Sequence, residues 1–338
     1  MKACVFKAPG APLEVVEVPD PKAGPGEVVV RVKNCGICGS DLHAVQWGVL
    51  PAGTIMGHEF SAVVDELGDG VSGVQPGDPV MVVPTINCGE CEFCRTGQAL
   101  LCTRQAGIGF EAAGAYAEKV RTRPGVLLKM PPGLSHRAAA TVEPAVVGLH
   151  GLHRSGLMVG ETCVVMGAGP IGLVTTMWAR FAGARAVVVS EMAEGRRAMA
   201  LKMGADIVVN PRERSPVQEL IKLTGDGPDV VFECIGVPGT IDEAIRYVRK
   251  GGRVVVIGAC GQPDNFTPMR ALRREVDVRF SSGADLREFQ TVMALMASGR
   301  VSTEPMITHT VAIDDLPRAF AQLSRPNDQC KVMLEFPN

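Results

Sequence analysis

The sequence predicts an α/β protein built from a β-rich domain and a doubly wound parallel sheet. Three observations lead to this prediction. The chain has 338 residues, about twice the length of a typical domain of ~150 residues. Up to about residue 130, short valine-rich runs alternate with glycine and proline. From about Leu134, strand-like and helix-like segments follow one another, which is typical of a parallel sheet covered by helices.

In the β-rich part, strands with turn signals about every ten residues indicate a compact antiparallel domain. We expect these strands at residues 13–19, 26–32, 60–68, 78–84 and 115–120. The chain ends with a helix at 288–298 and short segments at 309–313, 317–324 and 331–336.

In the second part, apolar runs of strand length alternate with helical patterns. We expect strands at residues 162–166, 184–191, 206–210, 229–236 and 253–258. The intervening helices are expected at residues 170–183, 196–204 and 240–252.

Composition excludes several classes of function. The net charge is −2 and basic residues are dispersed, so there is no electrostatic reason to expect nucleic acid. The N-terminus lacks the apolar segment of a signal peptide, and the longest apolar run is broken by glycine and proline. Eleven cysteines, an odd number, indicate metal chemistry in a reducing compartment. We expect a cytoplasmic protein with no membrane partner.

The turn after the first strand of the second domain carries a glycine motif. Gly167, Gly169 and Gly172 follow the spacing GxGxxG between a strand and a helix. The first glycine permits a tight turn, the second lets the backbone approach a pyrophosphate, and the third lets helix and strand pack closely. The helix N-terminus, with Pro170 and Ile171, offers free N–H groups to the phosphates. The motif therefore predicts dinucleotide binding.

Glu191 ends the next expected strand, where a carboxylate accepts hydrogen bonds from a ribose hydroxyl and repels a 2′-phosphate. We therefore expect NAD rather than NADP. Arg196, which we also assign to the cofactor site, and Arg197 lie about one helical turn further on and could override this preference. The alternative is a solvated glutamate without a cofactor role.

Four cysteines in NCGECEFCRTGQALLC follow the spacing C-x2-C-x2-C-x7-C: Cys88, Cys91, Cys94 and Cys102. Four thiolates without an open position are typical of a closed, structural zinc site. Iron–sulfur motifs begin similarly, but their fourth cysteine follows after three residues and precedes proline. A structural zinc ion is therefore favoured over an iron–sulfur cluster, and we expect no catalysis at this site.

A metal that binds substrate needs an open coordination position. The run CGICGSDLH at residues 35–43 and the run GHE at residues 57–59 supply one thiolate, one imidazole and one carboxylate at wide sequence separation. A metal held by such a mixed set leaves room for water or an alcohol and acts as a Lewis acid.

These motifs, with Glu143-Pro144 and the GAGPIG turn, resemble the zinc-dependent medium-chain alcohol dehydrogenases, especially the sorbitol, butanediol and threonine dehydrogenase branch. The likeness covers nearly the whole chain, and the motifs occur in family order. It implies a GroES-like catalytic domain formed by residues 1–145 and 286–338, with the cysteine lobe at 88–102. A Rossmann domain would occupy residues 146–285, and the active site would lie in the cleft between the domains.

The resemblance also implies a role for each metal-site residue. Cys38 and His58 match the ligands of the catalytic zinc, and Glu59 matches the carboxylate that ligates it in the sorbitol branch. Glu143 matches the glutamate that reaches the metal directly or through water. Cys35 matches no ligand, and we expect it to pack in the core.

For the proton path, Ser40 matches the hydroxyl that hydrogen-bonds the substrate oxygen, and His43 matches a later member. We also expect cofactor contacts from Gly236, Val237, Gly258, Ala259, Ser281 and Ser282. Other histidines and cysteines have no partner pattern. His150 and His153 are spaced i, i+3, but nothing in the nearby sequence completes a metal set.

We therefore expect an oxidoreductase that uses NAD and two zinc ions, one catalytic and one structural, to interconvert a secondary alcohol and its ketone. The rivals are a zinc-free quinone or enone reductase and a catalytically silent relative, but every ligand motif is present. Polyol-specific relatives carry an aromatic residue and an Arg-Tyr pair where this chain has Ala44 and Gly283-Ala284. We thus favour a small alcohol or vicinal diol over hexitols, and a homo-oligomer, a tetramer rather than a dimer.

Overall fold

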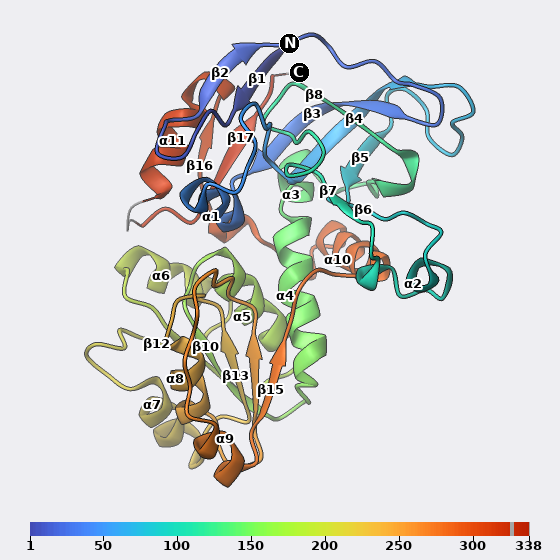
Figure 1. The fold of residues 1–338 in the computed structure, drawn as a ribbon. Helices are drawn as coiled ribbons and strands as arrows, with labels where there is room; N and C mark the ends of the chain where they lie inside the picture. Colours follow the sequence, from blue (N-terminus) through green and yellow to red (C-terminus); the bar gives the residue numbers. More distant parts are fainter. Residues whose placement is uncertain (325–327, 338) are drawn as a thin grey trace.

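The structure is a computed structural model that describes residues 1–324 and 328–337. It contains one large sheet of seven strands and another of six, in the upper and lower halves of Figure 1. One buried apolar core belongs to the β-rich half and another to the parallel half, and a third includes residues of both, such as Met81 and Val165. The predicted α/β fold class is confirmed.

The seven-stranded sheet joins segments from both ends of the chain. Its central strand β3 (Val28–Gly36) pairs antiparallel with β4 (Glu59–Leu67) and with β17 (Lys331–Glu335). The other members are β5 (Pro79–Val82), β8 (Lys119–Thr122), β9 (Leu127–Lys129) and β16 (Ile307–Val311). The named strands within residues 1–130 pair antiparallel, as predicted for that part of the chain, whereas the C-terminal strands β16 and β17 pair in parallel. The parallel pair needs a crossover connection, which includes the helix α11 (Leu316–Leu323).

The six-stranded sheet has the order β12-β11-β10-β13-β14-β15, and every neighbouring pair is parallel. This is the doubly wound order, with its reversal between β10 and β13. The strands are β10 (Thr162–Met166), β11 (Ala186–Ser190), β12 (Ile207–Val209), β13 (Val230–Glu233), β14 (Arg253–Val256) and β15 (Asp277–Phe280). The helices of this half are α5 (Pro170–Phe181), α6 (Glu194–Lys202), α7 (Pro216–Thr224), α8 (Thr240–Tyr247) and α9 (Pro268–Arg274). Its central strands are valine-rich and fully buried, as expected of a sheet covered on both faces.

The long helix α4 (Val142–Ser155) runs between the two halves of the molecule (Figure 1). It packs against α5, β14 and β4, and against α10 (Leu286–Ala297). The fully buried Trp178 of α5 donates from Nε1 to the Ala145 carbonyl oxygen at 2.7 Å. These contacts tie the parallel sheet to the helix that enters the β-rich half.

Shorter elements complete the fold: the hairpin β1 (Lys2–Val5) and β2 (Glu14–Glu17), the pair β6 (Thr85–Ile86) and β7 (Ala106–Gly107), and the helices α1 (Gly39–Trp47), α2 (Glu92–Arg95) and α3 (His136–Ala139). No helix within residues 1–324 and 328–337 is long and apolar enough to cross a bilayer.

Candidate active site and cofactor edge

The N-terminus of α1 positions the first group of the site. Cys38 is the N-cap residue, and its backbone N–H donates to Oδ2 of Asp41 at 3.1 Å. Ser40, in the first turn, donates from Oγ to the Cys38 Sγ at 3.2 Å.

The structure brings three of the predicted ligands together. The Cys38 Sγ, an imidazole nitrogen of His58 and a carboxylate oxygen of Glu59 lie within 4.8 Å of one another. The Ser40 Oγ lies 3.4 Å from His58 Nε2. Glu143 is outside this group, but burial, opposed by His58 and reinforced by Glu59, raises the pKa of its carboxyl to about 7. The donor set is one that zinc accepts.

His58 has a buried partner that the sequence analysis did not assign. Its Nδ1 lies 3.3 Å from Oδ1 of the fully buried Asp41, close enough for an ion pair but not aligned as a hydrogen bond. Tyr116 donates to Oδ2 of the same carboxylate at 2.6 Å. Burial alone would lower the pKa of His58, but the charges of Asp41 and Cys38 hold it well above its usual value. Asp41 thus fixes the ring with Nε2 turned toward Ser40.

Glu59 is held by Lys331 of β17, another partner that sequence reasoning missed. The two side chains are 1% exposed each, and Lys331 Nζ also donates to the Ile37 carbonyl oxygen at 2.9 Å. Gly36 makes room for the pair, because a Cβ there would lie 2.2 Å from Oε2 of Glu59. Asp41 could have been suspected from its place in the CGSDLH run, but no local signal marks Lys331.

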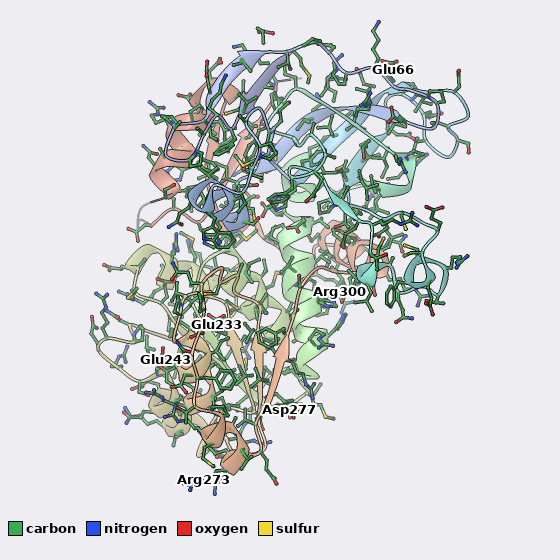
Figure 2. All side chains as sticks on the ribbon, in the orientation of Figure 1. Glu66, Glu233, Glu243, Arg273, Asp277 and Arg300 are labelled. Carbon is green, nitrogen blue, oxygen red and sulfur yellow. The ribbon has the colours of Figure 1, made fainter. Side chains whose placement is uncertain are left out.

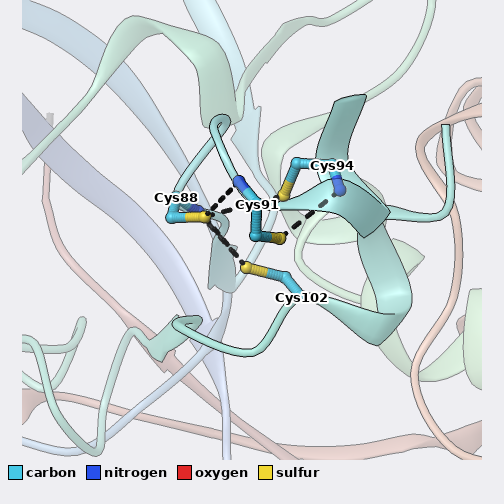
Figure 3. Close-up of side chains that lie close together, drawn as sticks. All are labelled: Cys88, Cys91, Cys94 and Cys102. Atoms are coloured by element: carbon cyan, nitrogen blue, oxygen red, sulfur yellow. Dashed lines mark hydrogen bonds between the residues drawn. The ribbon is translucent and has the colours of Figure 1, made fainter. Parts of the chain in front are cut away.

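The four lobe cysteines converge around one point, as Figure 3 shows. Their Sγ atoms lie within 4.8 Å of one another. The N–H groups of Cys91 and Cys94 donate to the Sγ atoms of Cys88 and Cys91, at 3.4 Å and 3.5 Å. The Cys94 N–H lowers the pKa of Cys91 to about 6. Backbone donors around converging sulfurs are the environment of metal-bound thiolates.

The residues expected to bind the cofactor gather at the carboxyl ends of the parallel strands. Gly167 has φ +89°, and a Cβ at Gly172 would lie 2.0 Å from the Gly167 carbonyl oxygen, so this turn requires both glycines. The later strands contribute the segments Gly236-Val237, Gly258-Ala259 and Ser281-Ser282 at the same edge. This is where doubly wound sheets bind nucleotides.

Glu233, the last residue of β13 and labelled in Figure 2, stabilises a loop at this edge. Its buried carboxylate accepts hydrogen bonds from the N–H groups of Ile235 and Gly236, each at 2.8 Å. It thereby fixes the loop after β13, and the sequence analysis had given it no role.

Glu191 lies beside the glycine turn. Its carboxylate oxygens accept from the N–H groups of Ala168 and Ala193, both at 2.8 Å. Arg196 donates to the Gln329 carbonyl oxygen at 3.1 Å and 2.8 Å. Arg197 donates to the backbone carbonyl oxygens of Glu191 and Met192. Of the two arginines, Arg197 is therefore the one held at the Glu191 backbone.

Comparison with known proteins identifies the family. The description "Alcohol dehydrogenase GroES-like domain" matches residues 24–132, and "Zinc-binding dehydrogenase" matches residues 170–298. The L-threonine 3-dehydrogenase of Pyrococcus horikoshii is 34% identical over 344 residues, which cover 98% of each chain. The chain belongs to the zinc-dependent alcohol dehydrogenase family.

This dehydrogenase is also 30% identical to the sorbitol dehydrogenase of Bacillus subtilis, over 96% of its own length and 94% of the relative's. The solved structure of 2R,3R-butanediol dehydrogenase from Bacillus subtilis matches with a TM-score of 0.90 and 31% identity, covering 100% and 99% of the two chains. A zinc-binding dehydrogenase from Sinorhizobium meliloti 1021 bound to NADP matches with a TM-score of 0.89 and 32% identity, covering 99% of each. The predicted family and enzyme class, an oxidoreductase acting on CH–OH groups, are confirmed.

Two histidines without an expected role share a partner in the structure. Nδ1 of His150 and Nδ1 of His153 lie 3.0 Å and 2.6 Å from the carboxylate of Glu288, on α10. These three do not form a metal-ligand group among the described residues. The cluster instead joins α4 to α10.

A cavity of about 600 Å³ lies between β3, α3, β16 and β17. Its lining includes Lys33, Asn34, His136, Arg137 and Glu335. It contains no candidate metal ligand and no residue of the cofactor edge, so we do not assign the dehydrogenase chemistry to it.

Proposed function

We propose that this chain is an NAD-dependent zinc dehydrogenase that oxidises a small or medium secondary alcohol, or a small vicinal diol, to the ketone and catalyses the reverse reduction. The observation that carries the proposal is the meeting of Cys38, His58 and Glu59 beside the Ser40 hydroxyl. The alternatives are dehydrogenation of L-threonine or of a polyol. A silent relative is disfavoured, because none of the expected ligand residues is missing.

The test is NADH production across secondary alcohols, 2,3-butanediol, L-threonine and sorbitol, with zinc measured on the same sample. We expect the highest specificity constant for a secondary alcohol or for butanediol. A preference for sorbitol, xylitol or L-threonine would refute the proposed substrate class. If the zinc-loaded protein showed no activity with any of these substrates, the proposed dehydrogenase activity would be refuted.

In this proposal Cys38, His58 and Glu59 would hold the catalytic zinc, and Glu143 would contribute directly or through water. Bound zinc supplies Lewis acidity that lowers the pKa of an alcohol. Ser40 accepts the substrate proton and His43 receives it later. No hydrogen bond joins Ser40 to His43 among the described residues, so this transfer needs an intervening hydroxyl or water.

A second, structural zinc is proposed at Cys88, Cys91, Cys94 and Cys102. With four thiolates the protein fills every tetrahedral position, which leaves none for substrate. The lobe also touches the other half of the molecule: a Cβ at Gly283 would lie 3.1 Å from Leu100 Cδ2. The lobe would therefore support the loop after β15.

The proposed preference for NAD over NADP rests on Glu191. A carboxylate held beside the glycine turn repels a 2′-phosphate. Arg196 makes no ion pair with Glu191 among the described residues, and its guanidinium donates to the Gln329 carbonyl oxygen. Arg197 is the residue that opposes the preference.

The proposed substrate class rests on the absence of donors at expected polyol positions. Ala44 is 4% exposed, and Gly283 and Ala284 carry no polar side-chain atoms. Arg279 does not replace the missing donors, since it donates to the Arg154 carbonyl oxygen and to Asp277. Each buried sugar hydroxyl left unpaired would cost ~1–3 kcal/mol.

We also propose a cytoplasmic homo-oligomer, with a tetramer favoured over a dimer. All eleven cysteines are free thiols, which suits a reducing compartment. β15 is an edge strand, and its Phe280 is 64% exposed, so it offers a surface for a second copy. The domain limits, 1–145 with 286–338 and 146–285, remain part of the proposal.

A further inference from the structure

Trp47, the last residue of α1, lies between two elements that the proposed reaction uses. Its ring stacks on the imidazole of His43, one turn earlier, with 5.1 Å between ring centroids and 19° between planes. Its far edge lies against Gly261, in the loop that follows β14. The side chain is held on both sides although 45% of the residue is exposed.

Glycine at position 261 is explained by the close approach of the indole and not by a special backbone conformation. A Cβ at this position would lie 2.4 Å to 2.7 Å from Cζ2, Cε2 and Cη2 of Trp47. Gly261 is not among the residues with positive φ, so its backbone accepts alanine without strain. The three atoms nearest to such a Cβ all belong to Trp47.

The loop that carries Gly261 also carries part of the cofactor edge. Its residue Gly258 packs on Gly236, and a Cβ at Gly258 would lie 2.3 Å from the Gly236 nitrogen. The loops after β13 and β14 are therefore in backbone contact and form one packed unit. Trp47 joins this unit to α1, whose N-terminus carries Cys38 and Ser40.

We propose that Trp47 is a positioning residue that couples cofactor binding to the orientation of His43, an inference that rests on the proposed function. The indole fixes the His43 ring by stacking and fixes the spacing between α1 and the cofactor loop through Gly261. When NAD(H) orders that loop, the loop in turn holds Trp47 and the ring beneath it.

A double-mutant cycle tests this coupling through cofactor affinity. In Gly261→Ala the new methyl group collides with the indole, and we expect the Kd for NADH to rise about tenfold. In the Trp47→Ala background the same change should leave Kd unaltered. Val49→Ala, an exposed position two residues beyond Trp47, is the matched control and should leave Kd unchanged. Additive effects of the two changes would overturn the proposal.

Kinetics separate positioning from simple packing. We expect Trp47→Ala to lower kcat as well as NADH affinity, and Trp47→Phe, which keeps an aromatic ring over His43, to restore most of kcat. Equal kcat in wild type and Trp47→Ala would overturn the role toward His43. If wild type oxidises no alcohol, the proposed function fails, whereas the Kd cycle still decides whether Trp47 couples α1 to the loop.

Fluorescence gives a second readout that needs no large truncation. The chain has two tryptophans, and Trp178 is fully buried. In Trp178→Phe all tryptophan emission comes from Trp47. We expect NAD to reduce quenching of this emission by iodide, and Gly261→Ala to abolish the reduction. Unchanged quenching on NAD binding in Trp178→Phe would contradict the coupling.

Discussion

Lys331 donates from its buried ammonium group to both carboxylate oxygens of Glu59, at 2.7 Å and 2.5 Å, across 272 residues of chain. Burial would lower the pKa of Lys331, but the charges of Glu59 and Cys38 hold it above its usual value. A candidate zinc ligand therefore has its charge balanced before any metal binds.

Replacing Lys331 with methionine should destabilise the zinc-free protein. The substitution leaves the Glu59 carboxylate buried without a partner, which costs about 3–5 kcal/mol. Urea unfolding of the chelator-treated protein measures the loss. The double variant Lys331→Met/Glu59→Gln removes both charges and should recover a large part of it. A double variant no more stable than Lys331→Met would contradict this account.

Asp41→Asn should weaken zinc binding at the site of Cys38 and His58. The amide keeps the shape of the carboxylate but loses the charge that orients His58, and such partners contribute about 10–100-fold to metal affinity. Competition with a chelator measures the change. Tyr116→Phe is the control, because it removes only a hydrogen bond to Asp41 and should have the smaller effect. Equal zinc affinity in Asp41→Asn and wild type would refute the role of Asp41.

Cys94→Ser should lower the melting temperature or change the oligomeric state before it affects turnover of the folded fraction. Structural zinc contributes free energy of folding, so loss of one thiolate acts on stability. Differential scanning calorimetry and light scattering make the measurement, with the exposed Cys260→Ser as control. An unchanged melting temperature and assembly with abolished turnover would mean that the two metal sites are assigned in reverse.

Glu191→Ala should raise the KM for NAD about tenfold and relax discrimination against NADP, since charged hydrogen bonds contribute about 1.5–3 kcal/mol. Steady-state kinetics with both cofactors measure it. In the wild-type background, Arg197→Ala removes the charge that opposes Glu191 and should reduce the use of NADP below that of wild type. A wild-type enzyme that prefers NADP would show that Arg197 overrides the carboxylate.

The cluster of Glu288 with His150 and His153 should make the free energy of unfolding depend on pH in the acid range. Burial raises the pKa of Glu288, but the hydrogen bonds from His150, the Asp285 N–H and His153 outweigh it and lower the pKa below 4.5. The folded-state pKa is below the unfolded value, so the stabilisation is present above pH 4.5 and lost as pH falls through the folded pKa.

Urea unfolding at a series of pH values from 6 to about 3 measures this effect. Wild type should lose more stability over this range than Glu288→Gln, which cannot titrate at this position. Glu304→Gln, at an exposed ion pair with Arg137, is the control and should follow wild type. Parallel curves for wild type and Glu288→Gln would rule the contribution out.

The parts of this fold that were predictable are those encoded locally. The valine-rich strands β10, β11 and β13 and the glycine turn depend on residues close in sequence, so pattern and spacing indicate them. β15 and α9 were missed because their sequences, DVRF and PMRALRR, are short, charged and lack a clear apolar period. α7 was missed although it has an N-cap serine followed by proline, which is a start signal that could have revealed it.

The candidate site divides in the same way. The four lobe cysteines were predictable from spacing alone, whereas the grouping of Cys38, His58 and Glu59 also depended on resemblance to a family. Lys331 and Glu288 were not found, because their partners are set by strand and helix packing over long sequence distances. The same holds for the contact of Trp47 with Gly261, although its other partner, His43, lies only four residues away. The sequence around a lysine in an apolar strand does not indicate which carboxylate will pair with it.

The pairing of β17 with β3 has a consequence for biosynthesis. Lys331 leaves the ribosome 272 residues after Glu59, which at ~5–20 residues per second is a delay of about 15–55 s. During that interval the parallel-sheet half is synthesised in full, while the Glu59 carboxylate lacks its permanent counter-ion. The Glu59 carboxylate can therefore meet its buried ammonium partner only after the last strand of the sheet has been made.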